Sequence, residues 1–195
     1  MGTRSNFNEI LFFVIVACSL TFSFAQELPK KIDGYKVHSE IIRISNDEDQ
    51  AKARAKIIVC EPTVSDISLS GITLNIAGEL QEAGLDGQIE HLKFRDFSVN
   101  GISVAVEPIN VSFILKKEGT TSLPVPATVF LSTPNILNAA WKEATASSGK
   151  WDVAGRVFVF GRFKKFGFSF KRVVPVDVRL TMPNPLAQLQ KDFAF

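Results

Sequence analysis

The chain has 195 residues, 46% of them apolar, with 22 Lys and Arg against 20 Asp and Glu. This composition excludes a disordered or low-complexity chain, and a net charge of +2 is too small for a dedicated nucleic-acid-binding protein. Two Cys and two His leave little for a metal centre or a disulfide framework. The length suits one domain.

The first 25 residues have the pattern of a secretory signal peptide. An apolar run from Ile10 to Ala17 follows the basic residue Arg4, and small side chains at Ser23 and Ala25 fit a signal-peptidase site. We therefore expect residues 1–25 to be removed after Ala25, and the protein to be secreted or periplasmic.

Two alternatives to this cleavage are open. Residues Ile15 to Cys18 resemble a lipobox, in which Cys18 would be lipidated and would tether the protein. An uncleaved anchor is the other alternative. If residues 1–25 are removed, Cys60 is the remaining thiol, so no internal disulfide can form and we expect Cys60 to be a small buried side chain.

Most of the remaining chain shows the period-two alternation of β-strands. We expect strands over residues 37–45, 51–59, 64–77, 89–99, 102–106, 111–116, 151–163 and 166–180. Asn100-Gly101 lies between two of these runs and predicts a type I′ hairpin, because that turn needs positive φ at both central residues. Gly71 predicts a bulge, residues 79–87 a loop, and Lys164-Lys165 a turn.

One helix is expected over residues 134–147. Thr133 suits the N-cap and Pro134 the first helical position, and an apolar stripe follows. Because helical crossovers between the strands are absent, a parallel α/β fold is excluded. The sequence predicts a mainly β chain: an antiparallel β-sandwich of about seven strands, immunoglobulin- or fibronectin-like, over residues 26–182, with a tail at 183–195.

Three segments resemble one known family. Leu123-Pro124-Val125-Pro126-Ala127 precedes the helix, an extended run goes from Trp151 to Phe160, and residues 89–107 contain the Val99-Asn100-Gly101 turn. This order resembles the late embryogenesis abundant (LEA) group-two fold, also called the water-stress and hypersensitive-response domain, over about residues 35–182. The family's Asn-Pro-Asn or Asn-Pro-Tyr signature is absent after the first long strand. The resemblance implies a compact sandwich without an active site, tied to stress protection.

No catalytic, cofactor-binding or metal-binding pattern is present in the sequence. Neither His38 nor His91 has zinc-ligand spacing around it, and no nucleophile elbow or phosphate-binding glycine loop occurs. We therefore expect a non-enzyme without a cofactor or a specific nucleic-acid partner. Nothing in the sequence fixes an oligomeric state.

Charge is segregated along the chain. Residues 150–195 carry nine basic and three acidic residues, a net charge of +6, whereas residues 26–149 carry 12 basic and 16 acidic residues, a net charge of −4. Phenylalanines interleave with the basic residues of the segment 158–172. The candidate site for an anionic lipid or another polyanion comprises Arg162, Lys164, Lys165, Phe166, Phe168, Lys171 and Arg172.

The alternative is that these phenylalanines fill the core while the charges line its edge. Both faces of the strand at 157–160 are apolar, with Val157 and Val159 on one face and Phe158 and Phe160 on the other. One face must then be covered by the helix or by a partner.

Two hypotheses of function follow. The first is a secreted or periplasmic, non-catalytic β-sandwich with a binding or stress-protective role in the cell envelope. The second is an envelope protein that binds anionic lipid or a polyanion through the Phe/Lys-rich hairpin 158–172.

Overall fold

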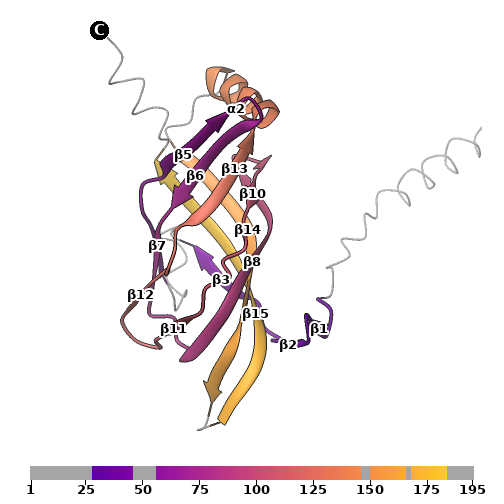
Figure 1. Cartoon of the computed structure of the whole chain (residues 1–195), viewed down its shortest axis with the longest axis vertical. Coiled ribbons are helices and arrows are strands. Elements are labelled where there is room, and N and C mark those ends of the chain that lie inside the picture. The colour runs from indigo at the N-terminus through magenta and orange to yellow at the C-terminus, as the bar shows by residue number, and fades with distance from the viewer. Residues whose placement is uncertain (1–27, 46–55, 146–149, 166–167, 184–195) are drawn as a thin grey trace, which may run out of the picture.

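The computed structural model describes residues 28–45, 56–145, 150–165 and 168–183. The predicted signal peptide, the predicted turn at 46–49 and the tail beyond Pro183 lie outside these residues. The described chain is mainly β, as predicted, and most strand pairs are antiparallel (Figure 1). The strands are β1 (Lys31–Ile32), β2 (Tyr35–Val37), β3 (Ile42–Ser45), β4 (Lys56–Val59), β5 (Thr63–Ser68), β6 (Gly71–Ile76), β7 (Gly78–Gln81), β8 (Gly87–Val99), β9 (Ile102–Ser103), β10 (Ala105–Val106), β11 (Phe113–Leu115), β12 (Thr120–Ser122), β13 (Ala127–Ser132), β14 (Lys150–Lys165) and β15 (Phe168–Pro183).

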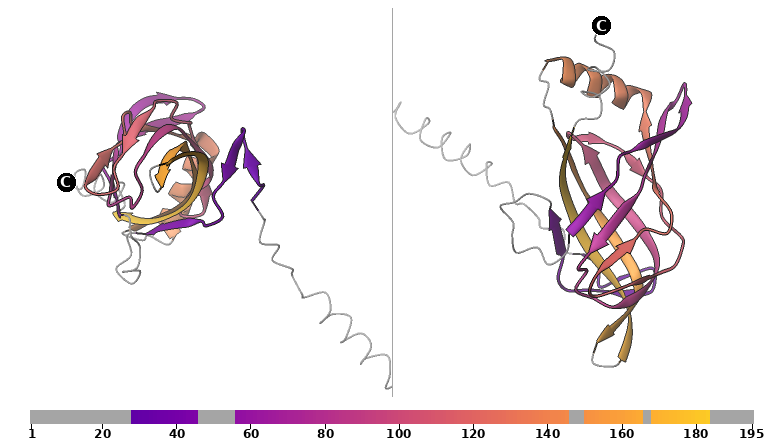
Figure 2. Two further views of the ribbon diagram at one scale, coloured as in Figure 1. Left: turned by 90° about the horizontal axis from the view of Figure 1, so that it is seen from below. Right: turned by 90° about the vertical axis from the view of Figure 1, so that its left-hand side faces the viewer.

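The strands form three sheets, and an immunoglobulin-like sandwich of about seven strands is not confirmed. The largest sheet has eight strands in the order β1-β2-β15-β14-β8-β11, with β3 beside β15 and β9 beside β8. It is mixed, because β2 and β3 run parallel to β15. The two smaller sheets have the orders β10-β13-β6-β5 and β12-β7-β4. Figure 2 shows the strands curving around one interior.

Of the two predictions made at glycines, the Asn100-Gly101 hairpin is confirmed and the bulge at Gly71 is wrong. Asn100 and Gly101 have φ of 50° and 73°, and Ser98 and Val99 pair with Ser103 and Ile102, so the predicted hairpin is confirmed. Gly71 is not at a bulge but begins β6, after a tight turn from β5. A Cβ there would lie 2.1 Å from the backbone oxygen of Leu131, which explains the glycine.

Three other predictions are corrected. The first residues of the expected loop at 79–87 belong to strand β7 (Gly78–Gln81), which pairs with β4 on one side and β12 on the other. Lys164 and Lys165, expected in a turn, are the last paired residues of β14. Cys60, expected to be buried, is exposed just beyond the end of β4.

The predicted helix is present as α2, Thr133–Thr145. Its Thr133 hydroxyl donates a hydrogen bond to the carbonyl of Leu69 at 2.7 Å, and its N–H donates to Ser70 at 2.9 Å. These bonds tie the start of α2 to the β5–β6 turn. The helix therefore packs at one end of the molecule, opposite the end of the β14–β15 hairpin (Figures 1 and 2).

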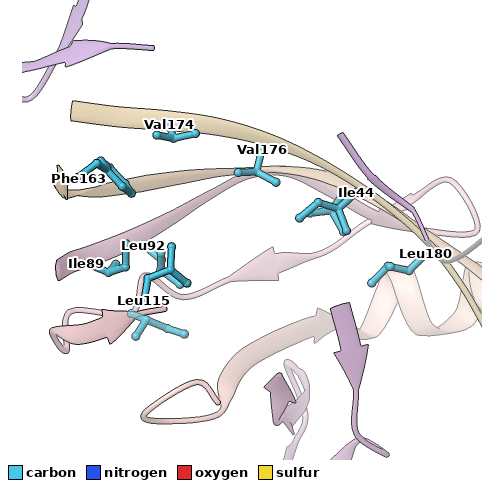
Figure 3. Packing of buried hydrophobic residues seen from close by; sticks show 10 residues of the cluster. Ile44, Ile89, Leu92, Leu115, Phe163, Val174, Val176 and Leu180 are labelled. Carbon is cyan, nitrogen blue, oxygen red and sulfur yellow. The ribbon is translucent and has the colours of Figure 1, made fainter. Parts of the chain in front are cut away.

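The hairpin of β14 and β15 has an apolar core on each of its faces. On the inner face, Val174, Val176 and Phe163 join a cluster with residues of β3, β8 and β11 (Figure 3). On the outer face, Phe160 and Val173 are fully buried. The expectation that α2 or a partner covers one face is wrong, because the N-terminal β1–β2 segment covers the outer face with Tyr35.

This arrangement makes the outer core essential to stability. We predict that Phe160→Ala lowers the free energy of unfolding by about 3–5 kcal/mol, because a fully buried ring leaves a cavity. Phe168→Ala, in the same hairpin but 70% exposed, should change it by less than about 0.5 kcal/mol. Urea denaturation followed by circular dichroism measures both, and equal losses would contradict the assigned burial.

Candidate functional site

The β14–β15 hairpin brings the predicted basic and aromatic residues together at its free end. We call residues 162–165 and 168–172 the hairpin tip. It protrudes from the end of the molecule opposite α2 (Figures 1 and 2). Of the seven candidates, Phe166 and the side chain of Lys165 lie outside what the structure describes. The other candidates are on paired strands, with Arg162 opposite Lys171 and Lys164 opposite Ser169.

The register gives the hairpin tip two different faces. Directly opposed residues of an antiparallel pair project to the same side, and successive residues alternate. The pair Phe163–Phe170 therefore shares the inner face, and Phe168, two residues before Phe170, lies on the same face. The pairs Arg162–Lys171 and Lys164–Ser169 share the outer face. The inner face is mainly aromatic and the outer face is cationic, so the hairpin tip is amphipathic.

The aromatic side chains become exposed toward the end of the hairpin. Phe163 is 7% exposed and belongs to the interior core, Phe170 is 41% exposed, and Phe168 is 70% exposed. The rings of Phe168 and Phe170 lie 6.5 Å apart, and the guanidinium of Arg172 lies 5.7 Å from the ring centre of Phe170. The predicted alternative, that all the phenylalanines fill the core, holds for Phe163 and not for these two.

Two of the predicted basic residues have partners on the outer face. Arg162 donates a hydrogen bond from Nε to Glu90 at 3.0 Å. Lys171 lies with Nζ 4.1 Å from the ring centre of Tyr35. Lys164 is exposed, and no ion pair engages it within the described part of the chain. The charges of Arg162 and Lys171 are therefore partly used to attach the β1–β2 segment.

That attachment centres on Tyr35, which sequence reasoning did not single out. The Tyr35 hydroxyl donates a hydrogen bond to Oε2 of Glu90, and its ring packs edge-on against Phe160, with centroids 5.1 Å apart. His91 stacks on the same Phe160 ring at 4.3 Å. We call Tyr35, Glu90, His91 and Phe160 the Tyr35 cluster.

A β-bulge places the carboxylate of this cluster. In the pairing of β8 with β14, His91 is opposite Phe160 and Ile89 is opposite Gly161, so Glu90 is the extra residue. A bulge redirects side chains, and here it turns Glu90 toward the outer face beside His91. The signal in the sequence is the three-residue spacing of the inward Ile89 and Leu92, which breaks the period of two.

The cluster shifts the acidity of its members. The hydrogen bond to Glu90, together with burial, raises the pKa of Tyr35 to about 12. The same bond lowers the pKa of Glu90 against the opposing effect of burial. Burial lowers the pKa of His91, which favours the neutral imidazole in its stack. The Tyr35 cluster thus holds the β1–β2 segment on the hairpin through matched hydrogen-bond donors and acceptors. We call this attachment the clasp.

The interior contains a cavity of about 180 Å³. On one side it is lined by Val157 of β14, Val176 of β15 and Leu92 of β8, and on the other by Ile57 of β4 and Leu80 of β7. Figure 3 shows several of the side chains of the large sheet directed into this space. The lining is almost wholly apolar. Such a space suits an apolar ligand.

Other chemistry has little support within the described ranges. There, no group of three or more His, Cys, Asp or Glu is close enough to hold a metal ion. In the same part of the chain, no helix combines the length and apolarity needed to span a membrane. His38 is half-buried, and its Nδ1 contacts the backbone of Glu40.

Two solved structures resemble this chain at low identity. One is a crystal structure of a protein from Archaeoglobus fulgidus, with 14% identity, a TM-score of 0.34, and coverage of 65% of this chain and 97% of that chain. The other is a solution structure of a protein provisionally assigned to the LEA proteins, with 10% identity, a TM-score of 0.26, and coverage of 71% and 77%. No protein-family model and no curated protein matches the chain. The resemblance to the LEA family therefore stays a prediction.

The clasp can be tested directly because Tyr35 is the single tyrosine of the chain. We predict that the ultraviolet absorbance of the phenolate titrates with a pKa of about 12 in the folded protein. Glu90→Ala removes both the acceptor and the charge, so the midpoint should fall toward the ordinary value of 10.0.

The same shift predicts how stability depends on pH. Because the folded pKa is raised, the contribution of Tyr35 is complete below its unfolded pKa and is lost as pH rises from about 10 to about 12. Tyr35→Phe should flatten this alkaline loss. Circular dichroism at each pH establishes that the chain is folded, and a wild-type midpoint near 10 in folded protein would contradict the clasp.

Proposed function

We propose that the protein is an exported, non-catalytic binding protein that docks on anionic lipid surfaces through the hairpin tip. The observation that carries the proposal is the pair of exposed rings, Phe168 and Phe170, at a protruding end that also presents Lys164 and Arg172. Aromatic rings enter the headgroup boundary, while Lys and Arg attract anionic headgroups. Neither the exposed rings nor the basic side chains at this end are part of a hydrophobic core.

Magnitudes favour a weak, reversible attachment. Full burial of one large apolar side chain contributes about 1.5–3 kcal/mol, and each Lys or Arg near an anionic surface about 1 kcal/mol. A few such groups on one hairpin give an association that salt can reverse. Since Arg162 and Lys171 also hold the clasp, Lys164, Lys165 and Arg172 carry most of the attraction.

The sequence supports the other parts of the proposal, which are export, a stress-protective role and the lack of catalysis. The apolar run ahead of Ala25 supports export to the periplasm or beyond, with lipidation at Cys18 as the alternative attachment. The resemblance to the LEA group-two fold supports a sandwich-like body, in which the large sheet faces the two smaller ones, and a stress-protective role in the cell envelope. The absence of a catalytic motif in the sequence supports a binding function without chemistry.

Vesicle binding tests the proposal. We predict that the protein binds vesicles containing anionic lipid at low salt, and that added salt weakens binding. Changing Lys164, Lys165, Lys171 and Arg172 to Gln should weaken binding by roughly 100-fold or more, since Lys164, Lys165 and Arg172 alone contribute about 1 kcal/mol each. Sedimentation with vesicles of increasing anionic content measures the effect.

A matched variant controls for net charge. Four exposed basic residues away from the hairpin tip, Arg43, Arg95, Lys150 and Arg179, are changed to Gln instead. This variant has the same net charge and should bind almost as the wild type does. Equal weakening in the two variants, or no binding by the wild type at low salt, would exclude docking by the hairpin tip.

A further inference from the structure

We infer that the interior cavity is a binding site for a fatty acid, with its alkyl chain between the sheets and its carboxylate toward Arg172. This inference goes beyond the docking function proposed above and does not depend on it. It rests on the lining, the length and the charge distribution of the cavity.

The lining excludes water and polar ligands. Of the side chains that border the cavity, only Glu79 and Thr121 are polar. An apolar cavity of roughly 150 Å³ stays dry and takes up apolar molecules such as benzene. The cavity here, at about 180 Å³, takes the inner part of an alkyl chain, and the rest of a longer chain extends toward the hairpin tip. Filling it with hydrocarbon restores the dispersion contacts that an empty space lacks.

The length of the lining fits an extended chain better than a rounded ligand. On β14 the lining runs from Val157 to Phe163, a distance of about 20 Å at the usual rise of a strand. On β15 it includes Val174, Val176 and Val178, along the same direction. A single acyl chain spans about half of the ~30 Å hydrocarbon core of a bilayer, which fits within this length.

The charges place the carboxylate at the end near the hairpin tip. Arg172 does not line the cavity itself, but it shares the inner face of β15 with the lining residue Val174 and lies two cross-strand pairs closer to the tip. It is half-buried, and its cross-strand partner Gly161 has no side chain to screen it. Glu79 borders the cavity on the opposite wall, but its carboxylate lies on the other face of β7 from Leu80, where it accepts a hydrogen bond from Ser122. Arg172 is therefore the charged group that attracts a carboxylate at this end of the cavity.

An apolar path connects this end with the hairpin tip. Phe163 lines the cavity and is the direct cross-strand partner of Phe170, which is 41% exposed. Phe168 follows on the same face. The exposed rings thus continue the inner face toward the surface, and Arg172 lies on this face between Phe170 and the lining residue Val174, where it can hold the carboxylate of a chain whose alkyl part lies in the cavity.

Calorimetric titration of the purified chain with dodecanoate, below the concentration at which it aggregates, tests the inference. We expect saturable binding of one dodecanoate per chain. Val174→Phe on one wall and Leu80→Phe on the other should each reduce the affinity at least tenfold, because the added ring fills the cavity. Val64→Phe, on the exposed β5, adds the same volume outside the cavity and should leave the affinity unchanged.

Arg172→Gln tests the position of the carboxylate without altering the core. It should weaken dodecanoate by roughly 10- to 100-fold, the range of a hydrogen bond to a charged group, and leave dodecanol unchanged. Thermal unfolding of each variant establishes that it is folded. No saturable binding, or equal affinity in wild type and both folded Phe variants, would overturn the inference. An equal loss for dodecanol would overturn the role of Arg172.

The two proposals fail separately. A variant with Lys164→Gln and Phe168→Ser changes the hairpin tip and leaves the cavity lining intact. It should lose vesicle binding while it keeps the affinity for dodecanoate. If the wild type binds dodecanoate but not vesicles, docking is wrong and the cavity site stands. If it binds vesicles but not dodecanoate, the cavity site is wrong and docking stands.

Discussion

The long β14–β15 hairpin imposes the constraint on which the rest of the molecule depends, because both of its faces are apolar and both need cover. The strands pair residue for residue from Lys150–Pro183 to Lys165–Phe168. Inside, the valines of both strands face the two smaller sheets. Outside, Phe160 and Val173 need a second layer, and the short β1–β2 segment supplies it with Tyr35. A strand buried on both faces loses its alternation, which is typical of parallel or central strands.

The bulge at Glu90 links the β1–β2 segment to the hairpin. It places an acceptor for the Tyr35 hydroxyl beside Arg162, so one carboxylate satisfies a phenol from the N-terminal segment and a guanidinium from β14. A buried hydroxyl without an acceptor would cost about 1–3 kcal/mol. The clasp thus depends on a local irregularity of β8, and the N-terminal segment depends on the clasp.

The sequence predicts what local chemistry determines. Asn100-Gly101 specifies its turn through φ, and Thr133-Pro134 specifies the start of α2, so both appear where expected. Partners distant in the chain decide the rest. Gly78–Gln81 carries little strand propensity and becomes β7 only because β4 and β12 flank it. The alternation of the hairpin tip was visible in the sequence, whereas the cavity arises from residues of many strands and has no local signal.

The same constraint explains why the candidate site lies where it does. The cover over both faces of the hairpin ends before the hairpin does, so the last inner-face rings, Phe170 and Phe168, continue the interior surface into solvent. A protein that needed only a stable core would end the hairpin at Phe163, since the pairs beyond it add exposed apolar area. The extension places aromatic rings and basic side chains where one surface can meet a lipid headgroup layer and lead inward to an apolar space. The proposed docking surface and the cavity are therefore two ends of one continuous face of β14 and β15.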